Sequence, residues 1–142
     1  MEDKVNKQLP IAILGILAVI AVLVLWPKAT QLPQEETTLI PDGFVIPSLN
    51  ATQKLGQSNF NKSCASCHGD YGLGSANGPP LMHRIYEPNH HGDGAFFLAA
   101  LNGVRAHHWK FGDMPPVDGI TETEIAPIVA YVRALQQANG VF

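Results

Sequence analysis

The chain of 142 residues has two cysteines, and both lie in the stretch Cys64-Ala65-Ser66-Cys67-His68. A disulfide between residues three positions apart would close a very small loop and add little stability. A thioredoxin-like redox pair needs a strand–helix context, and a zinc site needs further ligands at regular spacing; neither pattern surrounds the motif. The histidine that follows the second cysteine favours another chemistry, because Cys-x-x-Cys-His is the haem-attachment pattern. We therefore expect one covalent haem c, bound through thioethers of Cys64 and Cys67.

The composition of the chain excludes several classes of protein. A formal charge of −3 argues against nucleic-acid binding, and 46% apolar residues argue against disorder. Two cysteines are too few for a scaffold built on disulfides. The core must therefore come from apolar side chains and, in a domain as small as residues 51–142, from a large buried cofactor.

An uninterrupted apolar run extends from Leu9 to Trp26. As a helix it would be about 27 Å long, close to the hydrocarbon thickness of a bilayer. A cleaved signal peptide is the alternative, but its apolar region is usually shorter and is followed by small residues at a cleavage site, which the exit LWPKATQ lacks. We expect residues 9–26 to form an uncleaved transmembrane anchor after a short tail, residues 1–8.

The charges beside this run predict its orientation. Lys4 and Lys7 precede it and only Lys28 follows closely, which places the N-terminus in the cytoplasm. Residues 27–50 are rich in proline and have no sustained period, which is typical of a linker, although its patch LIPDGFVIP could instead pack on the domain or on a partner. We expect a single-pass protein of the cell inner membrane, with residues 51–142 on the periplasmic, non-cytoplasmic side.

A first helix is predicted to lead into the attachment motif. Gly56, Phe60 and Cys64 are four residues apart, so a notch without a side chain, an aromatic ring and the haem anchor share one stripe. A glycine inside a helix costs about 1 kcal/mol relative to alanine, which indicates a close helix contact there. A middle helix is predicted from about Asp93 to Leu101.

A last helix is predicted after Thr121. Thr121 and Glu124 form a capping box, and Ile125, Ile128, Val129, Val132 and Leu135 recur with helical period before the stop signal Asn139-Gly140. Pro127 lies inside the second turn and is expected to bend the start of this helix. Tyr131 is expected to pack against Gly56 or Phe60.

These elements combine into a longer pattern: Gly56-x3-Phe60-x3-Cys64-x2-Cys67-His68, a later Gly78-Pro79, Met114 followed by Pro115, and a final helix with Ile128 and Tyr131. The pattern resembles class I cytochrome c over residues 51–142, and Cys-x-x-Cys-His is its specific part. The resemblance implies an all-α fold of a few helices around one covalent haem. It also implies that the first and last helices cross near Gly56 and Tyr131, and that the protein is assembled outside the cytoplasm.

The resemblance also implies the iron ligands. His68 would be the proximal ligand, with its ring N–H donated to the carbonyl of Pro79. Met114 would be the opposite ligand, on a loop that Pro115-Pro116 makes rigid. Met82 is a competing thioether, although it follows His68 closely, and a bis-His site built from the histidine doublets is a second competitor.

Five further histidines are the unusual feature of the domain: His83, His90, His91, His107 and His108. They could be solvated surface residues, with one or two bonding a haem propionate, a role that Trp109 or Arg105 could share. They could also form a secondary copper or zinc site, or a pH-responsive docking surface. The sequence leaves these alternatives open.

The expected function follows from a haem with two strong protein ligands. Such a haem has no open position for a small-molecule substrate, so we expect a one-electron carrier rather than an enzyme. Its partners would be membrane redox complexes, such as a quinol-oxidising complex and a terminal oxidase. The alternatives are a fixed cytochrome c subunit of a respiratory oxidase or dehydrogenase, and a haem sensor or enzyme with a labile methionine ligand.

Overall fold

The structure is a computed structural model that describes residues 40–142. The predicted tail, the predicted transmembrane anchor at residues 9–26 and most of the predicted linker lie outside the described residues. Within residues 40–142, none of the helices combines the length and the apolar character that crossing a bilayer requires.

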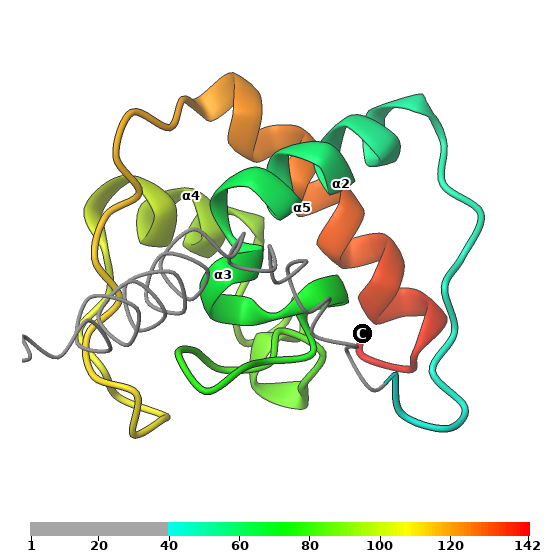
Figure 1. Cartoon of the computed structure of the whole chain (residues 1–142), viewed down its shortest axis with the longest axis horizontal. Helices are drawn as coiled ribbons and strands as arrows, with labels where there is room; N and C mark the ends of the chain where they lie inside the picture. The colour runs from blue at the N-terminus through cyan, green and yellow to red at the C-terminus, as the bar shows by residue number, and fades with distance from the viewer. Residues whose placement is uncertain (1–39) are drawn as a thin grey trace, which may run out of the picture. The chain divides into compact units, whose positions relative to one another are not determined.

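The described part of the chain is helical (Figure 1). Its four α-helices are α2 (Ala51–Ser63), α3 (Ala65–His68), α4 (Asp93–Asn102) and α5 (Glu122–Ala138). Two short 3₁₀ turns, η1 (Asp70–Gly72) and η2 (Arg84–Tyr86), lie between α3 and α4. Helix α2 packs across α5, and α4 packs on α5 as well. The all-α prediction is confirmed.

The crossing of α2 and α5 depends on Gly56. A Cβ atom at this position would lie 1.8 Å from the carbonyl oxygen of Pro127 and 2.9 Å from Cβ of Tyr131. One turn further along α2, the rings of Phe60 and Tyr131 pack with their centroids 5.6 Å apart. The predicted notch therefore receives the backbone of the last helix, and both aromatic rings are fully buried at the crossing.

Helix α5 supplies most of the core. Its start has the predicted capping box, in which the Glu124 carboxylate accepts a hydrogen bond of 3.0 Å from the Thr121 backbone N–H. The helix continues through Pro127, whose carbonyl oxygen faces the Gly56 notch. The core residues on α5 are the predicted apolar set together with the aromatic residue of the crossing: Ile125, Ile128, Val129, Tyr131, Val132 and Leu135.

The segment before α2 packs on the helical body. The ring of Phe44 lies 6.2 Å from that of Tyr71, and the carboxamide of Asn139 bonds both the N–H (2.8 Å) and the carbonyl (2.9 Å) of Val45. Leu49 also packs against the core. The patch LIPDGFVIP, residues 39–47, thus packs on the domain through Phe44 and Val45, as one of its two alternatives expected. Asn139 at the end of α5 bonds both backbone groups of Val45 in this extended segment.

Arg133 of α5 holds the chain between η2 and α4. Its guanidinium donates to the carbonyl oxygens of Tyr86 (2.7 Å) and His91 (2.5 Å), and its Nε donates to the Asp93 carboxylate at 2.7 Å. The same guanidinium lies 4.8 Å from the centroid of the Phe96 ring. This one side chain therefore fixes a loop that has little regular structure of its own.

Candidate functional site

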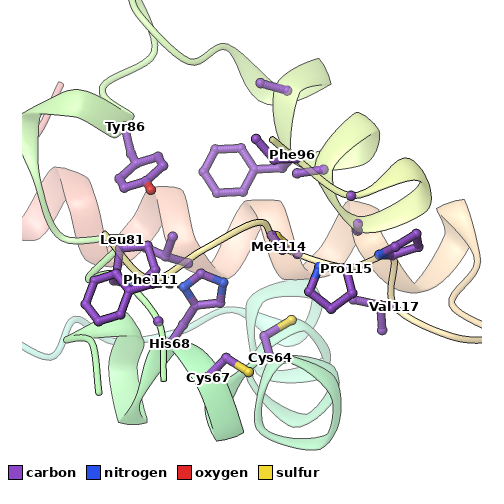
Figure 2. Close-up of a pocket in the computed structure, with 18 of the residues that line it drawn as sticks. Cys64, Cys67, His68, Leu81, Tyr86, Phe96, Phe111, Met114, Pro115 and Val117 are labelled. Atoms are coloured by element: carbon purple, nitrogen blue, oxygen red, sulfur yellow. Dashed lines mark hydrogen bonds between the residues drawn. The ribbon is translucent and has the colours of Figure 1, made fainter. Parts of the chain in front are cut away.

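A cavity of about 570 Å³ lies among α2, α3, α4, α5 and the loop before α5 (Figure 2). Its wall is mainly apolar and includes Phe60, Leu81, Phe96, Ile128 and Val132. Both cysteines of the motif and its histidine also line it. We call it the central cavity.

The turn from α2 into α3 positions the two cysteines. Cys64 ends α2 and begins α3: its N–H bonds the Phe60 carbonyl at 2.8 Å, and its own carbonyl accepts the N–H of His68 at 2.9 Å. Cys67 is exposed at the edge of the cavity, and both thiols are free. Burial, and then the neighbouring Cys67, raise the pKa of the Cys64 thiol to about 11. A thiol with so high a pKa is almost entirely protonated at neutral pH, so Cys64 has little thiolate character in the folded domain.

His68 is oriented by the loop that follows η1. Its Nδ1 lies 2.9 Å from the carbonyl oxygen of Pro79, and its ring lies at the central cavity (Figure 2). The loop fits closely, since a Cβ atom on Gly78 would lie 2.7 Å from the Cys67 carbonyl oxygen, and Ser75 Oγ donates to the same oxygen at 2.6 Å. Burial lowers the pKa of His68 and outweighs the opposing hydrogen bond with Pro79. The neutral ring therefore donates through Nδ1 and keeps the Nε2 lone pair for another partner.

Met114 reaches the cavity from a closed loop. Its backbone pairs with Val104 through two hydrogen bonds of 2.9 Å, and this bridge closes the loop between them. Gly103 has a φ of +74°, and a Cβ atom there would lie 2.5 Å from the Met114 carbonyl oxygen, so the loop requires glycine at this position. Figure 2 draws Met114 in the same cavity as His68, followed by Pro115. The competing Met82 lies against Gly72, packs on the core and does not line the cavity.

The indole N–H of Trp109 is a buried polar group at the central cavity. It has no hydrogen-bond partner among residues 40–142. The Tyr86 hydroxyl lies near the indole, but the geometry falls short of a hydrogen bond. A buried donor of this kind fits a carboxylate acceptor, which a haem propionate would supply. Arg105, the other residue considered for this role, does not line the cavity.

The histidines are not scattered over the surface. His91, His107 and His108 line one side of the central cavity, and the ring of His90 packs on those of His91 and His108. Partial desolvation and then the neighbouring imidazoles lower the pKa of His108. His83 lies apart from this group: its Nδ1 accepts the N–H of Ile85 at 3.2 Å, and its ring packs edge-on against Trp109.

Comparison with known proteins agrees with this geometry. The chain matches the family model of cytochrome c over residues 53–136, which is more than half of its length. The fold and the cavity define a class I cytochrome c domain, and the chain belongs to the cytochrome c family. No curated protein and no solved structure matches the chain at a significant level. Membership implies a covalently bound haem c and the function of a haem-based electron carrier.

Sequence reasoning missed the residues that act on the site from a distance. The sequence assigns no role to Arg133 or to Gln136, which is buried and donates to the Leu81 carbonyl at 2.9 Å. Both are long polar residues on an otherwise apolar helix, and that contrast is the signal that could have identified them. Of the two phenylalanines on α4, Phe96 and Phe97, only Phe96 lines the cavity.

Proposed function

We propose that this chain is a membrane-tethered one-electron carrier whose single haem c has His68 and Met114 as its axial ligands. The observation that carries the proposal is the meeting of an imidazole, a thioether and both cysteine thiols at one apolar cavity. Histidine with methionine is a ligand pair typical of cytochromes c, and it raises the reduction potential. Because side chains would hold both axial positions, no position is open for a substrate.

The residues around the cavity have separate tasks in this proposal. Cys64 and Cys67 attach the haem, which supplies a one-electron redox couple when it is bound. The Pro79 carbonyl fixes the tautomer and orientation of His68. The bridge to Val104 holds Met114 in place. A ligand set held in this way changes little on gaining or losing an electron, which favours fast transfer.

Electrons would enter and leave at the exposed edge of the cavity. Leu98 and Phe111 line the cavity and are 63% and 43% exposed, and Cys67 is exposed beside it. Exposed apolar side chains at the cavity opening suit the weak and transient contacts of redox partners. We propose that the partners are membrane redox complexes, such as a quinol-oxidising complex and a terminal oxidase.

The tether is proposed from the sequence. Residues 9–26 would anchor the chain in the cell inner membrane, and residues 27–50 would connect the anchor to a periplasmic haem domain, residues 51–142. Anchoring replaces free diffusion by a high effective concentration near membrane partners, as short linkers do in general.

The optical spectrum of the oxidised protein tests the ligand assignment. We expect the weak far-red band that reports methionine sulfur on ferric haem, and we expect Met114→Ala to abolish it while covalent haem is retained. Met82→Leu is the matched control and should keep the band, since Met82 does not line the cavity. A wild-type spectrum without the band, or a band that survives in Met114→Ala, would show that Met114 is not the ligand.

A further inference from the structure

Three histidine side chains converge beside the central cavity, and two of them, His91 and His108, line it. The ligating nitrogens of His90, His91 and His108 all lie within 4.8 Å of one another. The ring centroids are 4.7 Å apart for His90 and His91, and 5.5 Å apart for His108 with either of the other two. These residues come from two loops: His90 and His91 precede α4, and His108 lies on the loop that ends at Met114.

Hydrogen bonds anchor both of the loops that carry the histidines. Arg133 bonds the His91 carbonyl, and Nδ1 of the His91 ring is hydrogen-bonded to the carbonyl oxygen of Ile85. The second loop is closed by the bridge to Met114 and by a bond of 2.8 Å from the Ala106 N–H to the Asp113 carboxylate. The cluster is therefore set by two anchored loops rather than by mobile side chains alone.

The hydrogen bond of His91 is the arrangement that metal-binding histidines usually show. A ligating imidazole almost always donates its second ring N–H to a carboxylate, a backbone carbonyl or water. With Nδ1 donating to the Ile85 carbonyl, Nε2 of His91 has its lone pair free. Three imidazoles without a carboxylate among them match ions that prefer nitrogen, such as Zn²⁺ and Cu²⁺, and do not match Ca²⁺ or Mg²⁺.

We propose that His90, His91 and His108 form a binding site for one divalent transition-metal ion, Zn²⁺ or Cu²⁺, separate from the haem ligands. Two nitrogens that each lie 2.0–2.1 Å from a tetrahedral ion are about 3.3 Å apart. The nitrogens of the three histidines lie within 4.8 Å of one another, so each pair must approach by at most about 1.5 Å to bind one ion. His90 and His108 are exposed, and rotation of their side chains supplies this movement. A three-histidine site leaves a fourth position open to solvent.

Metal at this site would join the two loops that border the haem cavity. One of these loops leads to α4, and the other carries Met114. An ion that binds the folded state stabilises it by mass action, so the thermal midpoint of the haem-loaded protein should rise with metal concentration. The three histidines can bind the ion whichever side chain is the sixth ligand of the haem iron.

The test uses the haem-loaded full-length protein in detergent, oxidised and stripped with chelator. Zn²⁺ and Cu²⁺ are titrated separately by calorimetry, and bound metal is counted after desalting. We expect one ion per chain, tighter for Cu²⁺ as the general stability order predicts, with the far-red haem band unchanged. The double variant His90→Asn/His108→Asn should bind more than about tenfold more weakly, since even losing an outer-shell partner costs about 10–100-fold.

The matched control is His83→Asn. It removes a histidine outside the cluster and retains a side-chain acceptor for the Ile85 N–H, so one ion per chain should still bind. Uptake below one ion per wild-type chain would overturn the proposal. So would equal affinity in the wild type and the double variant, because the ion would then bind elsewhere.

Discussion

At the residue scale, Gly56 allows α2 and α5 to cross in close contact, because it has no side chain. The atom that a Cβ would meet is the backbone oxygen of Pro127, at 1.8 Å. A backbone oxygen inside a helix cannot rotate away as a side chain can. Relief would require α2 and α5 to separate, and that separation would open the packing of Phe60 on Tyr131.

Gly56→Ala is therefore expected to destabilise the haem-loaded protein by about 3 kcal/mol, which is the upper part of the usual cost of overpacking. Urea unfolding at neutral pH measures the change. Gly94→Ala is the matched control: Gly94 lies in the first turn of α4, and a Cβ atom there meets nothing within 4 Å. This second variant should be stabilising by about 0.5–1 kcal/mol. Equal effects of the two variants would contradict the role of the notch.

Tyr131 carries a second prediction at this scale. Its hydroxyl is buried and has no hydrogen-bond partner among residues 40–142, although Gln57 is nearby. Burial is the main cause that raises the pKa of Tyr131 to about 12, and the nearby Tyr71 adds to it. The folded state therefore holds this proton more tightly than the unfolded state does, for which the pKa is about 10. The stabilisation is complete below pH 10 and is lost as the pH rises from 10 to 12.

Tyr131→Phe should remove this part of the alkaline destabilisation. At neutral pH we expect the variant to be as stable as the wild type or more stable, because it removes a buried hydroxyl that has no hydrogen-bond partner within the described part of the chain. The free energy of unfolding, measured from pH 7 to 11.5, should fall less steeply in the variant. Parallel profiles for the two proteins would show that Tyr131 is not the titrating group. Tyr86→Phe serves as a comparison, since burial also raises the pKa of Tyr86.

At the element scale, the loop between η2 and α4 is held by a side chain rather than by regular structure. The Arg133 side chain is 16% exposed and reaches two backbone carbonyls and the Asp93 carboxylate. The planar guanidinium has several N–H groups and can donate to all three acceptors at once. A lysine ammonium is a compact charge and cannot reproduce this set of hydrogen bonds. The loop also carries His90 and His91, so the position of this part of the cavity rim depends on α5.

Arg133→Lys is expected to lower the free energy of unfolding by about 2 kcal/mol, because hydrogen bonds to a charged group contribute about 1.5–3 kcal/mol. The urea midpoint should shift without a change in the slope, since the folded state stays compact. Lys62→Gln is the control: Lys62 is 77% exposed and lies 3.9 Å from the Glu124 carboxylate. Its loss should change stability by less than about 1 kcal/mol. If both variants behaved alike, Arg133 would be an ordinary surface charge.

The features of the helices that the sequence could predict are those that depend only on neighbouring residues. The capping box of Thr121 with Glu124 is one of them, and the structure contains it. The four-residue spacing of Gly56, Phe60 and Cys64 predicted a close helix contact, and the structure has this contact at Gly56. Long-range contacts were not predictable. Asn139 bonds Val45 across 94 positions in the sequence, and no propensity or period in either segment indicates the other. The convergence of His90, His91 and His108 could not be predicted from the sequence either, because it depends on how two separate loops are anchored.

At the scale of the whole molecule, charge determines how the haem domain would meet its partners. Residues 51–142 contain six lysine and arginine residues against seven aspartate and glutamate residues, so their formal charge is 6 − 7 = −1. The exposed residues that line the cavity include the apolar Leu98 and Phe111. A nearly neutral domain with an apolar edge has little long-range attraction to a charged partner. Its encounters depend on the proposed tether and on short-range contact.

The electron-transfer rate with a membrane redox complex is therefore expected to depend only weakly on salt. Electrostatic steering raises association rates by about 10–1000-fold and is lost as ionic strength rises, so a carrier that uses it slows steeply. Here we expect a change of less than about threefold between 0.01 M and 0.15 M salt, measured by stopped-flow oxidation of the reduced protein. Lys110→Glu reverses one exposed charge beside Phe111, and its rate should converge with that of the wild type at the higher salt concentration. A fall of tenfold or more in the wild type would indicate a charged docking surface and would contradict docking through the apolar edge.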